Sequence, residues 1–406
     1  MTSRVGCISW EWDNVPYGYL FTVVVAAVVT ALALAPLRRP RPLAELSFRL
    51  GLVVNELPFV AIVWLIGWTG VAYAQGDLDS TAARVTAGVA ALTLPGLVVI
   101  ARRGLRARRV LDDALTEALG ADRRTHLATA SSLRTTRTLL TPFRRRRRGV
   151  ERIANIAYGD AGRRNLLDVY RRRSGPVSGA PVLVHLHGGG YRRGRKNTQS
   201  LPLIHRFANR GWVCVSANYR LRPAAQHPDH LIDLKKVIAW VRAHAHEYGA
   251  DPDTLVVSGS SAGGQMAALA ALTPGDPAYQ PGFADADTSV TAVISLNGYH
   301  GGYFDRDDES SPVFHVRPDA PPFLIVHGDA DTMVPVENAR AFTNALRSVS
   351  RNPVVYAELP GAQHAFDLFR SVRFEAVVDA TEEFVAWVRE QPAAPGGIRR
   401  NVAAEN

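Results

Sequence analysis

The sequence predicts an α/β protein, in which a mostly parallel sheet is covered by helices on both faces, preceded by an N-terminal helical transmembrane region. Three observations support this prediction. Apolar segments long enough to cross a bilayer are confined to residues 1–101. Short strand-like runs alternate with helical stretches over residues 151–391, which is typical of parallel sheets covered by helices. A G-x-S-x-G sequence lies between one such strand and one such helix.

Three apolar segments are the candidate membrane spans. Residues 18–37 carry no charged side chain, and about 20 such residues cross a bilayer core as a helix. Residues 50–74 contain Glu56 as their only charge and place aromatic side chains toward their far end, as expected at a membrane interface. Residues 85–101 are shorter and contain Pro95, so a re-entrant segment is an alternative to a span there.

The charges around these segments predict how the chain crosses the membrane. Acidic side chains precede the first segment and arginines follow it, which is the reverse of a cleaved signal peptide and favours an uncleaved anchor. Arginines occupy the first loop and follow the third segment, whereas residues 75–81 contain none. The positive-inside rule therefore predicts a multi-pass protein of the plasma membrane with its C-terminal part in the cytoplasm. If residues 85–101 do not span, this orientation reverses.

Residues 102–150 are predicted to be a basic juxtamembrane linker. The net charge of the chain is +10, and the 15 arginines and five acids between residues 102 and 152 account for all of it. The run Arg144–Arg148 is expected to bind anionic lipid headgroups, as polybasic segments beside a membrane span do. No aromatic side chains interleave with these arginines for base stacking, so nucleic acid is not an expected partner.

A catalytic domain is predicted over residues 151–391, followed by a disordered tail over residues 392–406. Six runs bounded by Gly, Pro or Asn are predicted strands: residues 181–186, 212–217, 254–258, 290–296, 323–326 and 354–359. Three stretches have apolar residues at helical spacing: residues 230–248, 336–349 and 374–389. The two cysteines, Cys7 and Cys214, lack metal-ligand spacing, and neither a metal nor a cofactor is expected.

The G-x-S-x-G sequence makes Ser261 the candidate nucleophile. Gly259 and Gly263 flank it, and small residues there permit the sharp strand-to-helix turn that exposes a serine hydroxyl. Upstream, His187, Gly188, Gly189 and Gly190 directly follow a predicted strand. Three glycines allow backbone N–H groups to converge on a developing oxyanion, and this order of motifs matches α/β-hydrolases.

A catalytic triad of this kind needs an acid and then a histidine further along the chain. Asp329 and Asp331 both follow the predicted strand at residues 323–326, so either is a candidate acid. His364 follows the next predicted strand and is the candidate base. All three lie where parallel strands end, which is the edge at which open α/β sheets gather their functional groups.

Residues from about 153 to 388 resemble the hormone-sensitive-lipase group of α/β-hydrolases, and the N-terminal hydrophobic region is similar to that of membrane-anchored carboxylesterases and lipases of mycobacteria and related actinobacteria. The stretches that carry the resemblance are residues 248–253, 261–264, 270–274, 353–360 and 363–367. The resemblance implies that Ser261 attacks the substrate, that Asp331 rather than Asp329 is the acid, and that His364 is the base. It also implies that Gly189, Gly190 and Ala262 supply the oxyanion N–H groups.

Two departures from that group affect the expected site. The group commonly carries an acid before the nucleophile, whereas this chain has Ser260, so any polar network kept by that acid is in doubt. Residues 297–322 are too few for the usual long helical cap, so a reduced cap and a more open acyl pocket are expected.

The expected function is hydrolysis of acyl esters or lipids by a membrane-anchored serine carboxylesterase or lipase, through an acyl-enzyme. An amidase or acyltransferase would use the same residues. A catalytically inactive binding domain of the same fold is a further alternative, although it would be expected to have lost at least one of Ser261, Asp331 and His364.

Overall fold

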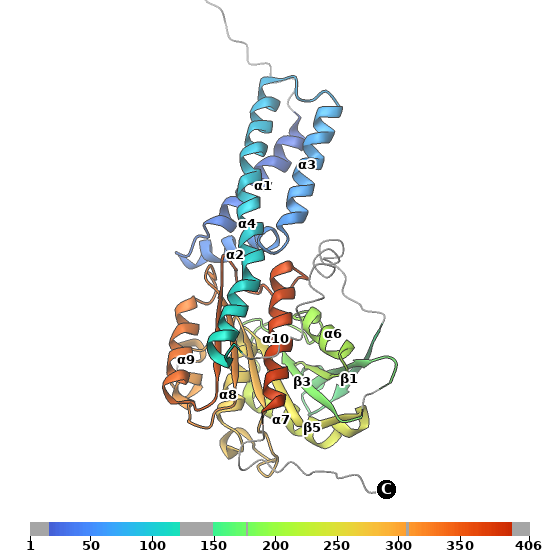
Figure 1. Cartoon of the computed structure of the whole chain (residues 1–406), viewed down its shortest axis with the longest axis vertical. Helices are drawn as coiled ribbons and strands as arrows, with labels where there is room; N and C mark the ends of the chain where they lie inside the picture. The colour runs from blue at the N-terminus through green and yellow to red at the C-terminus, as the bar shows by residue number, and fades with distance from the viewer. Residues whose placement is uncertain (1–15, 122–148, 176–177, 306–307, 392–406) are drawn as a thin grey trace, which may run out of the picture. The chain divides into compact units, whose positions relative to one another are not determined.

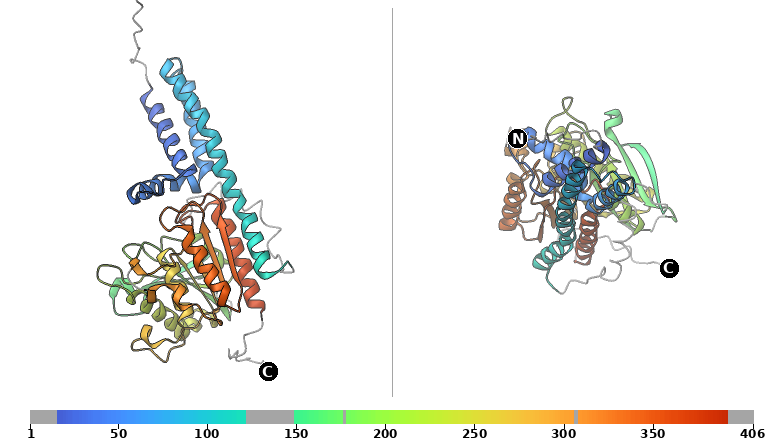
Figure 2. Two further views of the ribbon diagram at one scale, coloured as in Figure 1. Left: turned by 90° about the vertical axis from the view of Figure 1, so that its left-hand side faces the viewer. Right: turned by 90° about the horizontal axis from the view of Figure 1, so that it is seen from above.

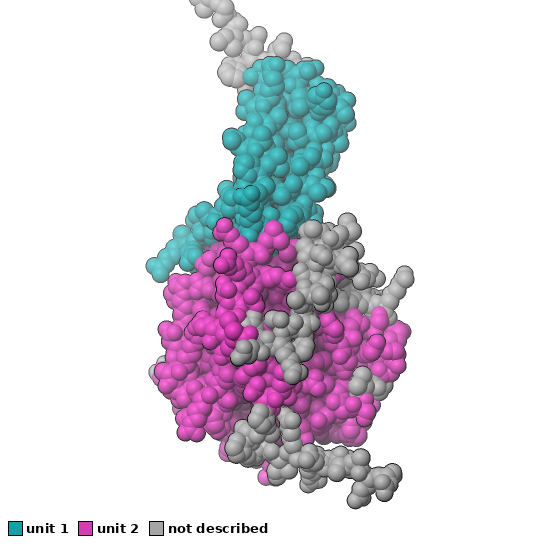
Figure 3. Space-filling view, viewed as in Figure 1, with its two compact units in different colours: residues 1–103 teal, residues 104–406 magenta. Residues whose placement is uncertain are grey.

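The computed structural model describes residues 16–121, 149–175, 178–305 and 308–391 (Figure 1). The chain divides into two compact units, Met1–Arg103 and Gly104–Asn406 (Figure 3). The predicted tail at residues 392–406 and the run Arg144–Arg148 lie outside the described residues.

The first unit consists of helices. They are α1 (Tyr17–Leu34), α2 (Arg41–Glu56), α3 (Pro58–Ala74) and the first part of α4 (Thr81–Leu119). By length and composition, α1 and α4 are each able to cross a membrane, and α2 with α3 would add a third span if the pair acts as one. The unit has its own small apolar core, which includes Val23, Leu65 and Leu97.

Residues 50–74, predicted to be the second span, are bent in the structure. Residues 50–56 belong to α2, which meets α3 at an angle of 84°. Proline at position 58 disfavours helical geometry in the residue before it, and Leu57 accordingly has φ −123° and ψ 48°. Residues 85–101, the shortest predicted span, lie within the long helix α4, which contains Pro95 in its interior and is long and apolar enough to cross a membrane.

The structure also differs from the expected linker, because α4 continues through residue 102 to Leu119. The part of α4 from Gly104 onward belongs to the second unit, and Figures 1 and 2 show it beside α10 (Val372–Glu390). Leu111 and Leu115 are buried there in a core shared with α10. These leucines lie four residues apart, on one face of the helix, just after the arginines that gave the segment the composition of a linker.

An eight-stranded sheet forms the centre of the second unit, with strand order β1-β2-β4-β3-β5-β6-β7-β8. The first two strands pair antiparallel, β2 is also antiparallel to β4, and all other neighbours are parallel. The strands are β1 (Val150–Ala157), β2 (Leu166–Arg172), β3 (Ala180–Leu186), β4 (Val213–Ala217), β5 (Ala250–Ser260), β6 (Ala292–Leu296), β7 (Phe323–Gly328) and β8 (Val354–Leu359).

Helices cover both faces of this sheet. One apolar core joins the sheet to α7 (Asp229–His244), α8 (Ala262–Leu272) and α9 (Val336–Val349). A second core on the other face joins it to α6 (Leu201–Asn209), α10 and the end of α4. The predicted α/β-hydrolase architecture, with a mostly parallel sheet between two helical layers, is therefore confirmed.

Candidate active site

Ser261 lies in the sharp turn between β5 and α8. Its φ of 55° is in the left-handed region, which few non-glycine residues adopt and which is associated with functional turns. The flanking glycines are needed for this turn. A Cβ atom at Gly259 would lie 2.0 Å from the carbonyl oxygen of Gly263, and one at Gly263 would lie 2.3 Å from that of Leu186.

The two other predicted triad residues meet Ser261 through hydrogen bonds. Nε2 of His364 lies 2.9 Å from Oγ of Ser261, and Nδ1 of His364 lies 2.7 Å from Oδ2 of Asp331. His364 follows β8 and Asp331 follows β7, so adjacent parallel strands deliver both side chains to the same edge of the sheet. This arrangement has the order of contacts needed to move a proton from the serine to the imidazole.

The structure distinguishes the two candidate acids. Oδ1 of Asp331 accepts hydrogen bonds of 2.8 Å from the backbone N–H groups of Met333 and Val334, which hold its other oxygen toward His364. Asp329 instead accepts a 2.6 Å hydrogen bond from the backbone N–H of Gly361. Asp331 is therefore the acid whose geometry fits an imidazole partner.

Burial and charge together set the protonation of this pair. Burial disfavours the charged imidazole, but the charge and hydrogen bond of Asp331 outweigh it and raise the pKa of His364 above its ordinary value. Burial likewise disfavours the carboxylate, yet His364 and His327 hold the pKa of Asp331 well below its ordinary value. At neutral pH the pair can thus stabilise a proton on His364 while Asp331 stays ionised.

The predicted oxyanion loop follows β3 and contacts the turn that carries Ser261. A Cβ atom at Gly188 would lie 2.9 Å from Cβ of Ser261, so the two backbones approach closely. Gly189 and Gly190 have φ values of 124° and 58°, which only glycine adopts readily. Ala262, the third predicted N–H donor, is the first residue of α8, where backbone N–H groups lack partners within the helix.

Other side chains support this loop without reaching the reacting atoms. His187 is buried, donates from Nδ1 to the carbonyl oxygen of Gly188 at 2.7 Å, and stacks on Tyr219 at 4.4 Å between ring centroids. The Tyr191 hydroxyl group donates a hydrogen bond of 2.6 Å to Oε1 of Gln265. These contacts fix the loop against α8 and against the segment that follows β4.

The segment that replaces a cap is short and irregular. Its described residues form only the 3-10 turns η5 (Tyr303–Asp305), η6 (Asp308–Ser310) and η7 (Pro312–His315). Gln265 anchors this segment to α8 by donating to the carbonyl oxygen of Gly301 at 2.6 Å. At the start of the segment, the guanidinium carbon of Arg222 lies 4.0 Å from the ring centroid of Phe304.

One carboxylate near the site had no role in the sequence-based prediction. Asp367 is buried and accepts a 2.5 Å hydrogen bond from Oγ of Ser260, the residue before Ser261. A carboxyl group therefore does lie beside the position at which an acid was expected from the resemblance, but it comes from the loop after β8. Asp367 comes three residues after the predicted base His364, and this short spacing is the feature of the sequence that could have indicated its location near the active site.

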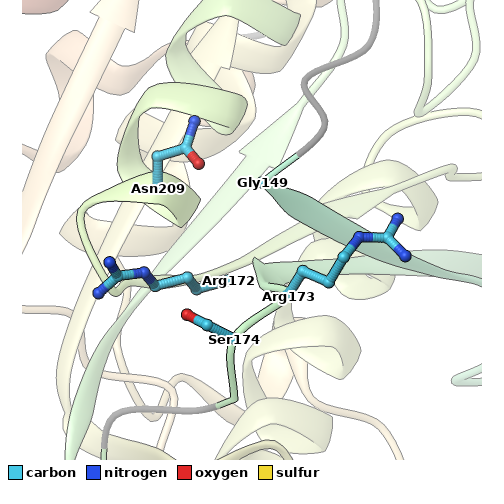
Figure 4. Close-up of a pocket in the computed structure, with 5 residues that line it drawn as sticks. All are labelled: Gly149, Arg172, Arg173, Ser174 and Asn209. Carbon is cyan, nitrogen blue, oxygen red and sulfur yellow. The ribbon is translucent and has the colours of Figure 1, made fainter.

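The described residues also contain a cavity of about 500 Å³ elsewhere on the second unit. It is lined by Gly149, Arg172, Arg173, Ser174 and Asn209 (Figure 4). Because β2 runs antiparallel to β4, the end of β2 at Arg172 lies at the opposite edge of the sheet from Ser261. Within the described ranges, no group of three or more His, Cys, Asp or Glu side chains is arranged to hold a metal ion.

Comparison with known proteins relates this chain to ester hydrolases. The BD-FAE family model matches residues 167–301 and 303–346. The chain is 40% identical to a Mycobacterium tuberculosis protein named "Probable carboxylic ester hydrolase LipM", over 91% of this chain and 93% of that protein. It is also 36% identical to esterase LipQ of the same organism, over 83% of this chain and 88% of that protein.

Solved structures agree with these relatives. Apo Thermogutta terrifontis esterase 2 matches with a TM-score of 0.52 and 28% identity, covering 61% of this chain and 97% of the esterase. The match thus takes in nearly the whole of that esterase but leaves a large part of this chain uncovered.

Proposed function

The chain belongs to the family of carboxylic ester hydrolases that includes mycobacterial LipM and LipQ, and we propose that it is a membrane-anchored serine esterase whose triad is Ser261, His364 and Asp331. The observation that supports this triad best is its two hydrogen bonds, from Ser261 to His364 at 2.9 Å and from His364 to Asp331 at 2.7 Å.

Acylation begins with attack of Oγ of Ser261 on the ester carbonyl carbon. Nε2 of His364 accepts the serine proton as the new C–O bond forms, and Asp331 stabilises the resulting imidazolium. Collapse of the tetrahedral intermediate breaks the bond to the leaving alcohol, which takes the proton from His364. Water then attacks the acyl-serine by the same steps and releases the carboxylic acid.

The backbone N–H groups of Gly189, Gly190 and Ala262 are the proposed oxyanion donors. The first two lie on a loop whose conformation requires glycine, and the third lies at the N-terminus of α8. Donors fixed in advance by the backbone need no reorganisation when negative charge develops on the carbonyl oxygen.

The membrane anchor is proposed from the first unit. Helices α1 and α4 are long and apolar enough to span a bilayer, and the arginines around them favour a multi-pass protein with its catalytic domain in the cytoplasm. The arginine-rich residues 102–150 would bind anionic lipid beside the membrane. Such an anchor suits an apolar acyl ester that reaches the site from the bilayer, across a reduced cap.

Hydrolysis of p-nitrophenyl esters of graded acyl length by membranes containing the protein tests this proposal. We expect activity that depends on acyl length and is abolished by Ser261→Ala, whereas Ser348→Ala, an exposed serine on α9, leaves it unchanged. Activity that survives Ser261→Ala, or cleavage of matched anilides with no cleavage of esters, would contradict it.

A further inference from the structure

Asp367 is a buried carboxylate that the acyl-transfer steps do not use. Its side chain is fully buried, and it follows His364 on the same loop after β8. An ionised group at such a position is costly unless hydrogen bonds satisfy it. The partners that satisfy it therefore indicate what the residue holds in place.

Neutral donors from three separate segments converge on this carboxylate. Oδ2 accepts from the hydroxyl groups of Ser260, at 2.5 Å, and Ser200. Oδ1 accepts from the side-chain amides of Gln199, at 2.9 Å, and Asn297, at 3.4 Å. Among the residues the structure describes, no Arg, Lys or His forms an ion pair with Asp367, so its direct side-chain partners are these four neutral donors.

One of these donors connects the carboxylate to the oxyanion loop. While Nε2 of Gln199 donates to Asp367, Oε1 of the same side chain accepts a 2.8 Å hydrogen bond from the backbone N–H of Gly188. Gly188 directly precedes Gly189 and Gly190. The orientation of the proposed oxyanion donors thus depends on a two-step chain of buried hydrogen bonds that ends at Asp367.

A second donor connects the carboxylate to the nucleophile. Ser260 is the last residue of β5 and is bonded directly to Ser261 in the chain. A Cβ atom at Gly188 would lie 2.9 Å from the backbone oxygen of Ser260, so the loop and the turn also touch each other. A shift of the oxyanion loop would therefore displace the turn that carries Ser261, and a shift of the turn would displace the loop.

We propose that Asp367 is a positioning residue, which fixes the oxyanion loop through Gln199 and the nucleophile turn through Ser260 relative to the loop that carries His364. This inference rests on the proposed serine esterase activity. The four donors named above all belong to the protein, so Asp367 can hold these segments in place before substrate binds. A carboxylate suits this role, since it accepts from several donors at once and charge-assisted hydrogen bonds are the stronger ones.

The charge of Asp367 supplies a second, separable effect. It favours the protonated imidazole of His364, together with the larger effect of Asp331. Burial lowers the pKa of His185 on β3 to about 4, and the charge of Asp367 opposes this only in part, so His185 stays neutral. Removing only the charge of Asp367 should therefore lower the pKa of His364.

Three variants of the full-length protein test the proposal: Asp367→Asn, Asp367→Ala and Gln199→Ala. Asp233→Asn is the matched control, because Asp233 is also a fully buried acid but lies on α7 and pairs with Arg220. The readouts are kcat and KM for a p-nitrophenyl ester and the pH profile of kcat/KM. Each kcat is divided by the concentration of active sites, which is measured as the amount of Ser261 that paraoxon labels in a separate sample.

Gln199→Ala and Asp367→Ala should lower kcat by about 10- to 100-fold with little change in KM, somewhat less than complete loss of an oxyanion donor costs. Asp367→Asn should also move the acid limb of the pH profile to lower pH. Asp233→Asn should change neither kcat nor the profile.

Wild-type values of kcat and pH profile in Asp367→Asn and Gln199→Ala would overturn the proposal, and these two variants decide it if Asp367→Ala fails to fold. An inactive wild-type protein whose Ser261 is not labelled would instead overturn the proposed esterase function.

Discussion

The end of α4 is predicted to be an integral part of the catalytic unit, and two leucines test this. Leu111 and Leu115 are only 2% and 1% exposed and pack in the core shared with α6 and α10. Truncation of such a buried leucine to alanine costs about 2–5 kcal/mol. In a unit of this size, that loss corresponds to a fall of roughly 5–15 °C in the unfolding midpoint.

The assay is the midpoint of thermal inactivation of ester hydrolysis by the detergent-solubilised full-length protein. Leu111→Ala and Leu115→Ala should each lower the midpoint, and the double variant should lose most of the unit's stability. Leu105→Ala is the matched control, because Leu105 lies on the same helix but is 47% exposed. If the buried and exposed substitutions had equal effects, α4 beyond Gly104 would be a tether, and the reasoning would be refuted.

Three further predictions concern the active site, the buried ion pairs between Arg206 and α10, and the first unit. Because His364 acts as a base only when deprotonated and its pKa is raised, kcat/KM should fall as the pH drops through a value above 6.5. Asp331→Asn should move this limb to lower pH and reduce kcat by about 10⁴-fold in steady-state assays. Arg206→Ala removes the guanidinium shared by three carboxylates of α10, each of which keeps one other arginine partner. It should therefore lower the inactivation midpoint, but by less than the about 3–5 kcal/mol that an unpaired buried charge costs; an unchanged midpoint would contradict this. Gly96→Leu should destabilise the first unit against detergent, because a Cβ atom there would lie 3.0 Å from a side chain of α1. Gly88→Leu, at a position with open space around it, should not.

Much of the catalytic unit could be predicted from the sequence because its signals are local. A strand followed by a glycine-flanked serine specifies a tight turn, and the parallel sheet then brings residues after successive strands to one edge. Ser261, Asp331 and His364 are far apart in the chain, yet each lies in the loop or turn that begins where a strand ends. Their proximity required only the order of strands β5, β7 and β8 in the sheet.

The features that escaped prediction depend on packing between distant segments. Strands β1 and β2 were not expected, because β1 is half-exposed at the sheet edge and mixes charged with apolar residues. The bend at Leu57 follows from a proline within an otherwise continuous apolar run. The network around Asp367 joins residues from Gln199 to Asn297, and no local pattern in the sequence links them.

Covalent labelling tests the central claim, that Ser261 is the nucleophile, most directly. Paraoxon is a suitable reagent, because an organophosphate phosphorylates a serine that a neighbouring base activates. After reaction of the full-length protein with paraoxon, peptide mass spectrometry should find one diethylphosphoryl group on Ser261, with ester hydrolysis lost in proportion to labelling. Ser261→Ala should take up no label. A label on a different serine, or full hydrolysis by protein labelled at Ser261, would contradict the account.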